Sequence, residues 1–425
     1  MKKLLYIFIT LAISALLLNR IIYREFPQKD RQKLLSETKQ YIQPIKSISM
    51  KYKGNSDLKV LDSILKDNRI LMLGENTHYD GSTLQAKGRL IQYLHENLGY
   101  NVVLYEAGQY DCWIMNEEMK NHSLKTSIDS IGGLGLFNFW WDNKETQPLI
   151  KYYQKTKVSS SPIELGGFDI QFSGEVLIKK RGKLLKTFLS KNNININSFP
   201  ILNKHINELQ NFVYKGYVDK LLNGKQKKDL LNEINQLERI VLRLKKTPEN
   251  EIYSKYFNDI GNNFNKAWKY NPGSLPSMHF RDSLMAKNLI WQIDSLYPKK
   301  KVIVWCANIH TFSAPYSKNY RPLGSYIKDR YGKASYMLDF SSYAKLNESK
   351  NLTDQPGKLA VENIFHETKT PYFILDLRSV QENSYLKKEF VSTINQGTDQ
   401  KKIWSHFIDG IFYIDTNTFL TPTKK

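Results

Sequence analysis

The most regular pattern of apolar and polar residues lies between residues 70 and 106. It opens with four apolar residues, Ile70 to Leu73, continues with a helical pattern from about Ser82 to Leu98, and closes with a second apolar run, Val102 to Tyr105. Short apolar runs joined by a capped helix are typical of a βαβ unit, because parallel strands are buried on both faces. The pattern therefore predicts two neighbouring parallel strands.

Similar apolar runs predict three further strands, at residues 163–167, 302–305 and 334–340. Between them, Leu230, Ile234, Leu237, Val241 and Leu244 form one helical stripe surrounded by lysines. We therefore expect an α/β fold with a mostly parallel sheet and flanking helices, a helical insertion and a small C-terminal α+β element.

The same pattern divides the chain into segments. Insertions such as the helical one cover a site as a lid in some proteins and are merely structural in others, and both interpretations remain open. The expected segments are a linker and lead-in at 26–55, a first part of the α/β core at 56–176, the helical insertion at 177–272, a second part of the core at 273–345 and the C-terminal element at 346–425.

Residues 1–25 are expected to lie outside the fold. Lys2 and Lys3 precede a 15-residue apolar run from Leu4 to Leu18. This is the layout of a signal peptide, and the run is short for a membrane span of about 20 residues. A cleaved signal and an uncleaved anchor at residues 4–23 both remain open. Both place the rest of the chain outside the cytoplasm, in the periplasm of a bacterial-type envelope or anchored to its inner membrane.

Composition adds little to this picture. The 425 residues are 41% hydrophobic and carry a net charge of +21, with lysines spread along the chain. A basic chain invites a nucleic-acid interpretation, but no nucleic-acid motif is present, so we expect no such partner. The two cysteines, Cys112 and Cys306, are too few for a disulfide framework and are expected to be free thiols.

Lys87 interrupts the apolar stripe of the helix that begins near Ser82. At about 100° per residue, it projects among Leu84, Ile91 and Leu94. A lysine on a buried face is costly unless it meets an anion, and Glu75 or Glu106 is the expected partner. The alternative is that its side chain extends to solvent from the start of the helix.

Polar groups follow four of the predicted strands. Ligands bind at the carboxyl ends of parallel strands, so these groups are expected to converge on one site. An aromatic segment before the third strand suits a pocket wall equally as well as core packing. The strand-end residues are Glu75, His78, Glu106, Asp169, Asn308 and His310, and the aromatic candidates are Trp140 and Trp141.

The chain carries a series of short motifs, in this order: Gly74-Glu75-x-Thr77-His78, the Lys87 position, the helix through Gly99-Tyr100, the strand ending in Glu106, Gly167-Phe168-Asp169-Ile170-Gln171, Arg281-Asp282-x-x-Met285-Ala286-x-Asn288, Trp305-x-x-Asn308-x-His310 and Asp409-Gly410-Ile411-Phe412. Together these motifs resemble the erythromycin esterase family, over roughly residues 55 to 422. The family often has Glu where Ser82 stands and His where Ala307 stands, so the resemblance implies the reaction class more than a macrolide substrate or antibiotic resistance.

The resemblance implies direct attack of water on a small-molecule ester or lactone, without a cofactor. A histidine between carboxylates is a suitable general base, so His78 is expected to activate the water. Glu75 and Glu106 would orient His78 and the water, Lys87 would tune these carboxylates, and His310 would be a second acid/base or an oxyanion donor. Asp169, Asn308, Trp140 and Trp141 would bind substrate. No serine lies in a Gly-x-Ser-x-Gly elbow, which disfavours a serine esterase.

Two other functions remain open. The same histidines and carboxylates suit a Zn²⁺- or Mn²⁺-dependent hydrolase, although Glu75-x-x-His78 lies in a loop and matches no standard helical metal motif. A non-catalytic envelope binding protein on an esterase scaffold is the third possibility. Its support is Ser82 and Ala307 at positions where the family often has ionisable residues.

Overall fold

The computed structural model describes residues 28–122, 127–178, 180–206, 222–347 and 349–423. The expected signal or anchor segment, residues 1–25, lies outside these ranges. Within them, no helix is both long enough and apolar enough to cross a membrane.

The described part of the chain is built on a nine-stranded sheet with the order β1-β8-β11-β6-β2-β5-β3-β4, in which β7 pairs with β6. The six strands from β11 to β4 pair in parallel, whereas β1, β7 and β8 pair antiparallel. The predicted α/β fold with a mostly parallel sheet is therefore confirmed. The strands are β1 (Ile42–Pro44), β2 (Ile70–Leu73), β3 (Tyr100–Gly108), β4 (Glu164–Asp169), β5 (Lys301–Trp305), β6 (Ser335–Leu346), β7 (Leu352–Thr353), β8 (Tyr372–Asp376) and β11 (Gly410–Thr418).

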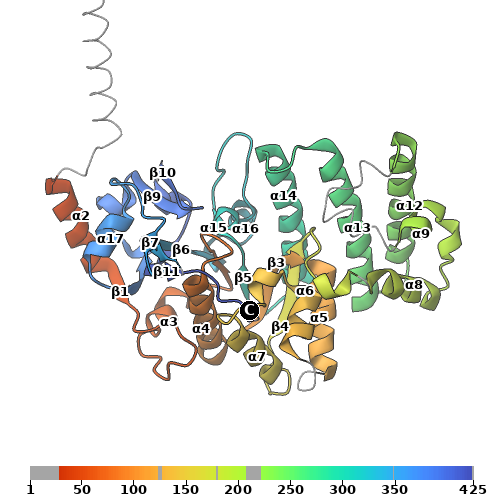
Figure 1. Ribbon diagram of the computed structural model, residues 1–425, viewed down its shortest axis with the longest axis horizontal. Helices are drawn as coiled ribbons and strands as arrows, with labels where there is room; N and C mark the ends of the chain where they lie inside the picture. Colours follow the sequence, from red (N-terminus) through yellow and green to blue (C-terminus); the bar gives the residue numbers. More distant parts are fainter. Residues whose placement is uncertain (1–27, 123–126, 179, 207–221, 348, 424–425) are drawn as a thin grey trace, which may run out of the picture.

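Helices cover both faces of the sheet (Figure 1). Along β2, Leu71 and Leu73 pack into the core that contains α4, whereas Ile70 and Met72 pack with α14 and α16 on the opposite face. Burial on both faces explains why this strand is a continuous apolar run. The helices around the sheet are α2 (Gln28–Tyr41), α3 (Val60–Ile64), α4 (Gly81–Leu98), α5 (Gln109–His122), α6 (Ile128–Gly135), α7 (Gln147–Thr156), α14 (Leu275–Trp291), α15 (Asn308–Thr311), α16 (Leu323–Tyr331) and α17 (Glu362–Glu367).

One feature of the predicted βαβ unit is wrong. β5 lies between β2 and β3, so the two strands joined by α4 are not neighbours. The apolar pattern reports how deeply a strand is buried but not which strand lies beside it. Leu73 and Tyr105 both pair with Trp305, so all three strands end at the same edge of the sheet.

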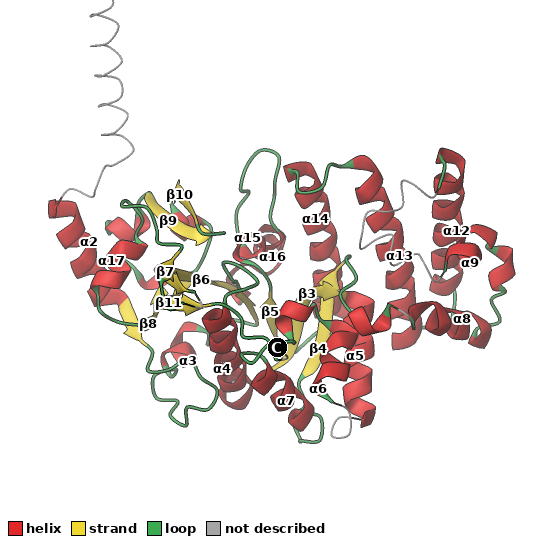
Figure 2. Cartoon of the chain, viewed as in Figure 1, coloured by secondary structure: helices red, strands yellow, loops and turns green. Residues whose placement is uncertain are grey.

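Beyond the β4 edge, four helices in the described part of the chain extend away from the sheet (Figure 2). They are α8 (Arg181–Lys191), α9 (Pro200–His205), α12 (Gly224–Leu242) and α13 (Pro248–Lys269). The stripe residues Leu230, Ile234 and Leu237 pack in a core of their own with residues of α13. A buried ion pair between Arg181 of α8 and Asp111 of α5, with Nε 3.0 Å from Oδ1, joins this helical region to the sheet domain.

The C-terminal residues contribute to the sheet itself. β8 and β11 extend the main sheet beside β6, and β9 (Phe390–Asn395) and β10 (Thr398–Lys402) form a separate two-stranded sheet. Asn76, in the loop after β2, bridges to this hairpin: its Nδ2 donates to the carbonyl of Thr393 at 3.1 Å, and its Oδ1 accepts from the amide of Gly397 at 2.9 Å. The hairpin thus holds the loop that carries Glu75 and His78.

Candidate active site

The loop after β2 turns sharply at Gly74. A Cβ at this position would lie 2.9 Å from Asp339 Oδ1 and would also collide with the side chain of Asn308, so only glycine fits. The amide of Asn308 is used within the fold, because its Nδ2 donates to the carbonyls of Phe340 and Ile394. Asn308 is 1% exposed and lies beneath the loop, where it supports Gly74 rather than facing a substrate.

Glu75 is completely buried and accepts four hydrogen bonds. His78 Nδ1 lies 2.6 Å from Oε1, and Lys87 Nζ lies 2.7 Å from Oε2. Two indoles complete the set: Trp140 Nε1 donates to Oε1 and Trp305 Nε1 donates to Oε2, both at 2.9 Å. Burial alone would raise the pKa of Glu75, but Lys87 and His78 outweigh it and lower the pKa. Glu75 is therefore an ionised acceptor with no lone pair left for water.

Lys87 pairs with Glu75 and does not extend to solvent. Its side chain is 0% exposed, and its ammonium also lies 4.4 Å from the centre of the Trp305 ring. Burial lowers the pKa of Lys87 even though Glu75 acts against that shift. Lys87 is thus tolerated in the apolar stripe of its helix because the carboxylate of Glu75 lies inside the core and pairs with it.

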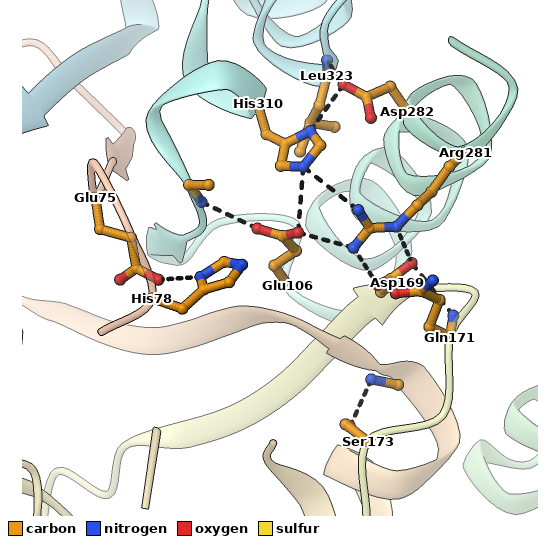
Figure 3. A network of polar contacts seen from close by, with 12 residues as sticks. Glu75, His78, Glu106, Asp169, Gln171, Ser173, Arg281, Asp282, His310 and Leu323 are labelled. Atoms are coloured by element: carbon orange, nitrogen blue, oxygen red, sulfur yellow. Dashed lines mark hydrogen bonds and ion pairs between the residues drawn. The ribbon is translucent and has the colours of Figure 1, made fainter. Parts of the chain in front are cut away.

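His78 is the exposed member of this group, with 33% of its side chain accessible. Its ring stacks on Phe139 at 4.7 Å and extends from Glu75 toward Glu106 (Figure 3). Burial lowers the pKa of His78, but hydrogen bonding to Glu75 and the charge of Glu106 raise it above its ordinary value. Since Glu75 holds Nδ1, Nε2 is the nitrogen available for chemistry.

Glu106 lies opposite, at the end of β3, and is 3% exposed. Its Oε2 accepts from the amide of Ala307 at 3.0 Å, and its Oε1 accepts from Arg281 Nη2 at 2.7 Å. His310 Nε2 lies 3.2 Å from the same Oε1. Burial opposes ionisation, but His310 and Arg281 hold the pKa of Glu106 well below its usual range.

His310 is held between two carboxylates. Its Nδ1 lies 2.9 Å from Asp282 Oδ2, and its Nε2 faces Glu106. Burial lowers the pKa of His310, but Asp282 and Glu106 together raise it to about 10. His310 is therefore an imidazolium at neutral pH. Asp282 is fixed in turn by the hydroxyl of Tyr320 and the amide of Leu323, at 2.9 and 3.0 Å.

Arg281 and Asp169 complete this half of the site. Arg281 Nε lies 3.0 Å from Asp169 Oδ1, and its Nη2 bridges Asp169 and Glu106. Asp169 is completely buried, so it binds the guanidinium rather than lining an open surface. Arg281, Asp282 and Tyr320 were not among the predicted site residues. Arg281 and Asp282 could have been found from the sequence, because they belong to one of the motifs that carry the family resemblance, but no functional role was inferred for them.

The two candidate tryptophans lie in different places. Trp140 is 2% exposed and donates to Glu75. Trp141 packs against Gly132, where an added Cβ would lie 2.6 Å from the tryptophan Cβ. Both belong to the core on the α4 face of the sheet. The aromatic segment therefore contributes core packing at these two positions, while Phe139 lies against the exposed ring of His78.

The five predicted catalytic residues thus form two facing groups. Glu75, His78 and Lys87 form one, and Glu106 and His310 form the other, with His78 extending between them (Figure 3). Among the described residues, no three His, Cys, Asp or Glu side chains converge in an arrangement that would hold a metal ion. Both histidines have Nδ1 engaged by a carboxylate.

A family model described as erythromycin esterase matches residues 95–415 of this chain. The putative hydrolase YbfO of Bacillus subtilis is 29% identical over 334 residues, which cover 71% of this chain and 72% of the relative. Erythromycin esterase type II of Escherichia coli is 22% identical over 309 residues, covering 68% and 72%.

Two solved structures share the fold. A protein titled succinoglycan biosynthesis protein superposes with a TM-score of 0.74 at 18% identity, covering 93% of this chain and 99% of that one. A mutant of the erythromycin esterase EreC in its open conformation superposes with a TM-score of 0.64 at 13% identity, covering 87% and 96%.

Proposed function

This chain belongs to the erythromycin esterase family and is a hydrolase, and we propose that it cleaves a carboxylic ester or lactone of a small molecule by direct attack of water. The observation that carries the proposal is the pairing of one exposed histidine with a buried, ionised carboxylate. The His78 side chain is 33% exposed, whereas its partner Glu75 is 0% exposed.

In this proposal His78 is the general base. Glu75 keeps the proton on Nδ1, so Nε2 accepts a proton from water as the oxygen attacks the ester carbonyl carbon. The imidazolium that forms is stabilised by Glu75 and by Glu106, the two charges that raise the pKa of His78. Glu75 remains ionised throughout because its four acceptor positions are already filled.

His310 supplies the complementary acid. As an imidazolium it shares its Nε2–H, which lies 3.2 Å from Glu106, with the carbonyl oxygen as negative charge develops there, and it then gives this proton to the departing alkoxide. Asp282 and Glu106 fix its ring from both sides. Arg281 holds Glu106 in place, so that Glu106 orients the two histidines relative to each other.

The test is hydrolysis by the purified full-length chain of a panel of macrolides and simple aryl esters, with and without a chelator. His78→Ala is expected to lose roughly 10²–10⁴-fold in turnover, the usual worth of a general base. His366→Ala is the matched control. His366 also bonds a carboxylate through Nδ1, 2.7 Å from Asp415, stacks on an aromatic ring and has a 36% exposed side chain, but lies in another part of the fold.

Three outcomes separate the candidate functions. Ester hydrolysis that depends on His78 and survives chelation supports the proposal. Activity that chelation abolishes and Zn²⁺ or Mn²⁺ restores would replace it with the metal-dependent hydrolase. No turnover of any ester, together with retained binding of a panel member, would favour the binding protein.

A further inference from the structure

The two indoles that contact Glu75 differ from its other partners in one chemical respect. Each carboxylate oxygen has one titratable donor and one indole donor: His78 with Trp140 on Oε1, and Lys87 with Trp305 on Oε2. Histidine and lysine can lose the proton they share, whereas an indole N–H is a donor only and does not titrate. The indoles therefore hold the carboxylate in every protonation state of its other partners.

Their geometry restrains the carboxylate in both position and rotation. Trp140 reaches it from the segment before α7, and Trp305 reaches it from the end of β5. Both side chains are almost completely buried, and their N–H···O distances are 2.9 Å. A carboxylate with a fixed donor on each oxygen cannot rotate to present a different oxygen to His78.

We propose that the indole N–H groups of Trp140 and Trp305 are positioning donors, which hold Glu75 so that its Oε1 fixes the Nδ1–H tautomer of His78. The tautomer matters because Nε2 is the ring nitrogen of His78 that does not contact Glu75, and it lies on the side of the ring toward Glu106 (Figure 3). The catalytic consequence rests on the proposed role of His78 as general base, whereas the effect on the histidine itself does not.

Loss of one indole N–H has a predictable sign. The freed lone pair leaves more negative charge on Glu75 to act on His78, since charge-assisted hydrogen bonds share a fixed carboxylate charge among their donors. The protonated form of His78 is then favoured, and its pKa rises. A tryptophan that served only for packing would change the stability of the fold without moving this pKa.

The chain offers a matched control in Trp404. This side chain is also completely buried, and its Nε1 donates to the carbonyl of Phe390 at 3.1 Å, in the core around the C-terminal hairpin. Replacing it removes the same volume and the same kind of hydrogen bond. Its acceptor is the backbone carbonyl of Phe390 in β9, the hairpin strand that also helps to hold the loop of Glu75 and His78, and not Glu75 itself. The 404 variant therefore separates destabilisation of the core and of this hairpin from loss of a donor to Glu75.

The experiment replaces each tryptophan in the full-length chain with 3-benzothienylalanine, which keeps the ring shape but has sulfur in place of N–H. Trp→Phe variants provide a second, fully genetic series. The ring signals of histidine are followed by NMR through a pH titration, and those of His78 are identified by their loss in His78→Ala. We expect the pKa of His78 to rise by about 0.5 or more in the 140 and 305 variants and to stay unchanged in the 404 variant.

The second readout is turnover of an aryl ester as a function of pH. The acid limb of kcat is expected to move upward with the pKa of His78, and KM to change little. The proposal is overturned for either tryptophan if its variant leaves the His78 titration in place, or if the 404 variant shifts it equally. The NMR titration can be measured even if the chain hydrolyses no ester. A shifted pKa of His78 in such a chain would reject the proposed function and leave the positioning role of the two tryptophans supported.

Discussion

Asp282 fixes the ring of His310 through a contact of 2.9 Å between Oδ2 and Nδ1. Asp282 is itself buried and bonded by Tyr320 and by the amide of Leu323, so it has little freedom to follow a different ring orientation. His310 is thereby kept as an imidazolium whose remaining N–H faces Glu106.

Asp282→Asn is expected to move the alkaline limb of activity to lower pH. The amide carries no charge, so the imidazolium loses one of the two anions that raise the pKa of His310 to about 10. The measurement is the pH dependence of kcat for an aryl ester. Asp294→Asn, which removes a carboxylate from a surface pair with Arg330, should leave the limb in place. An unshifted limb in Asp282→Asn would remove His310 from the acid role.

The stability of the fold is expected to depend on the proton of the His310 imidazolium. The folded pKa of His310, about 10, exceeds the ordinary 6.5, so the folded chain binds a proton that the unfolded chain releases in this window. The contribution to the free energy of unfolding is complete below pH 6.5 and is lost as pH rises toward 10. Denaturant titrations at pH 6, 8 and 10 should show a steeper decline for the native chain than for His310→Gln.

Lys87→Met is expected to lose activity by about 100-fold or more, the usual effect of removing a positioned charge. It also leaves Glu75 as a buried anion without its cation, which typically destabilises a fold by about 3–5 kcal/mol. Adding Glu75→Gln should restore part of the stability but none of the activity. Lys157→Met, at another buried lysine beside Glu164, should lose stability and keep its turnover. Full activity in Lys87→Met would contradict the electrostatic role.

Asn76→Ala is expected to lower kcat about 10-fold, because it cuts two hydrogen bonds worth about 1 kcal/mol each between the site loop and the hairpin. Steady-state kinetics together with thermal melting provide the measurement. Asn363→Ala also removes an amide that bonds two backbone carbonyls, at 2.8 and 3.0 Å, but lies in α17. If both variants behave alike, the hairpin does not control the loop.

The apolar run from Leu4 to Leu18, preceded by Lys2 and Lys3, motivates a prediction about location. A reporter that is active only outside the cytoplasm, fused after Lys425, should give signal in a bacterial host. A second fusion with a reporter active only inside the cytoplasm should stay silent, and signal from it would reject export. Deleting residues 1–25 is the control that should reverse both results.

Much of the fold was accessible from the sequence because parallel strands carry a simple pattern. β2, β3 and β5 each contain an uninterrupted apolar run with a polar residue within three positions after it, and strand ends meet at one edge of a sheet. This places Glu75 and Glu106 near each other even though the position of β5 between their two strands was not predicted. Lys87 was accessible for a different reason, since a charge inside an apolar stripe demands a partner.

Other parts were not accessible because they depend on long-range partners. Arg281 reaches Glu106 from a helix whose orientation relative to the sheet no local pattern encodes. Asn308 follows a strand, as the other candidates do. Its side-chain amide donates to the backbone carbonyls of Phe340 and Ile394 and not to a substrate, and the sequence around Asn308 does not show which segments pack against it. An indole that packs and an indole that donates to a carboxylate have the same apolar signature, so the role of Trp305 stayed hidden.

The strand order also determines when the proposed catalytic centre can assemble. β2 is synthesised early, but in the sheet it lies between β5 and β6, which are synthesised much later. Glu75 therefore lacks its hydrogen bond from Trp305 until a further 230 residues have been added to the chain. The start of α4, the helix after this loop, gains its partner even later, because the backbone amide of Ser82 donates to the side-chain oxygen of Asn417, 335 residues away. Contacts this distant in sequence form slowly and late. A growing chain therefore carries every residue of the first group, Glu75, His78 and Lys87, long before it carries the residues that hold them, and the proposed centre can be complete only after almost the whole chain has been made.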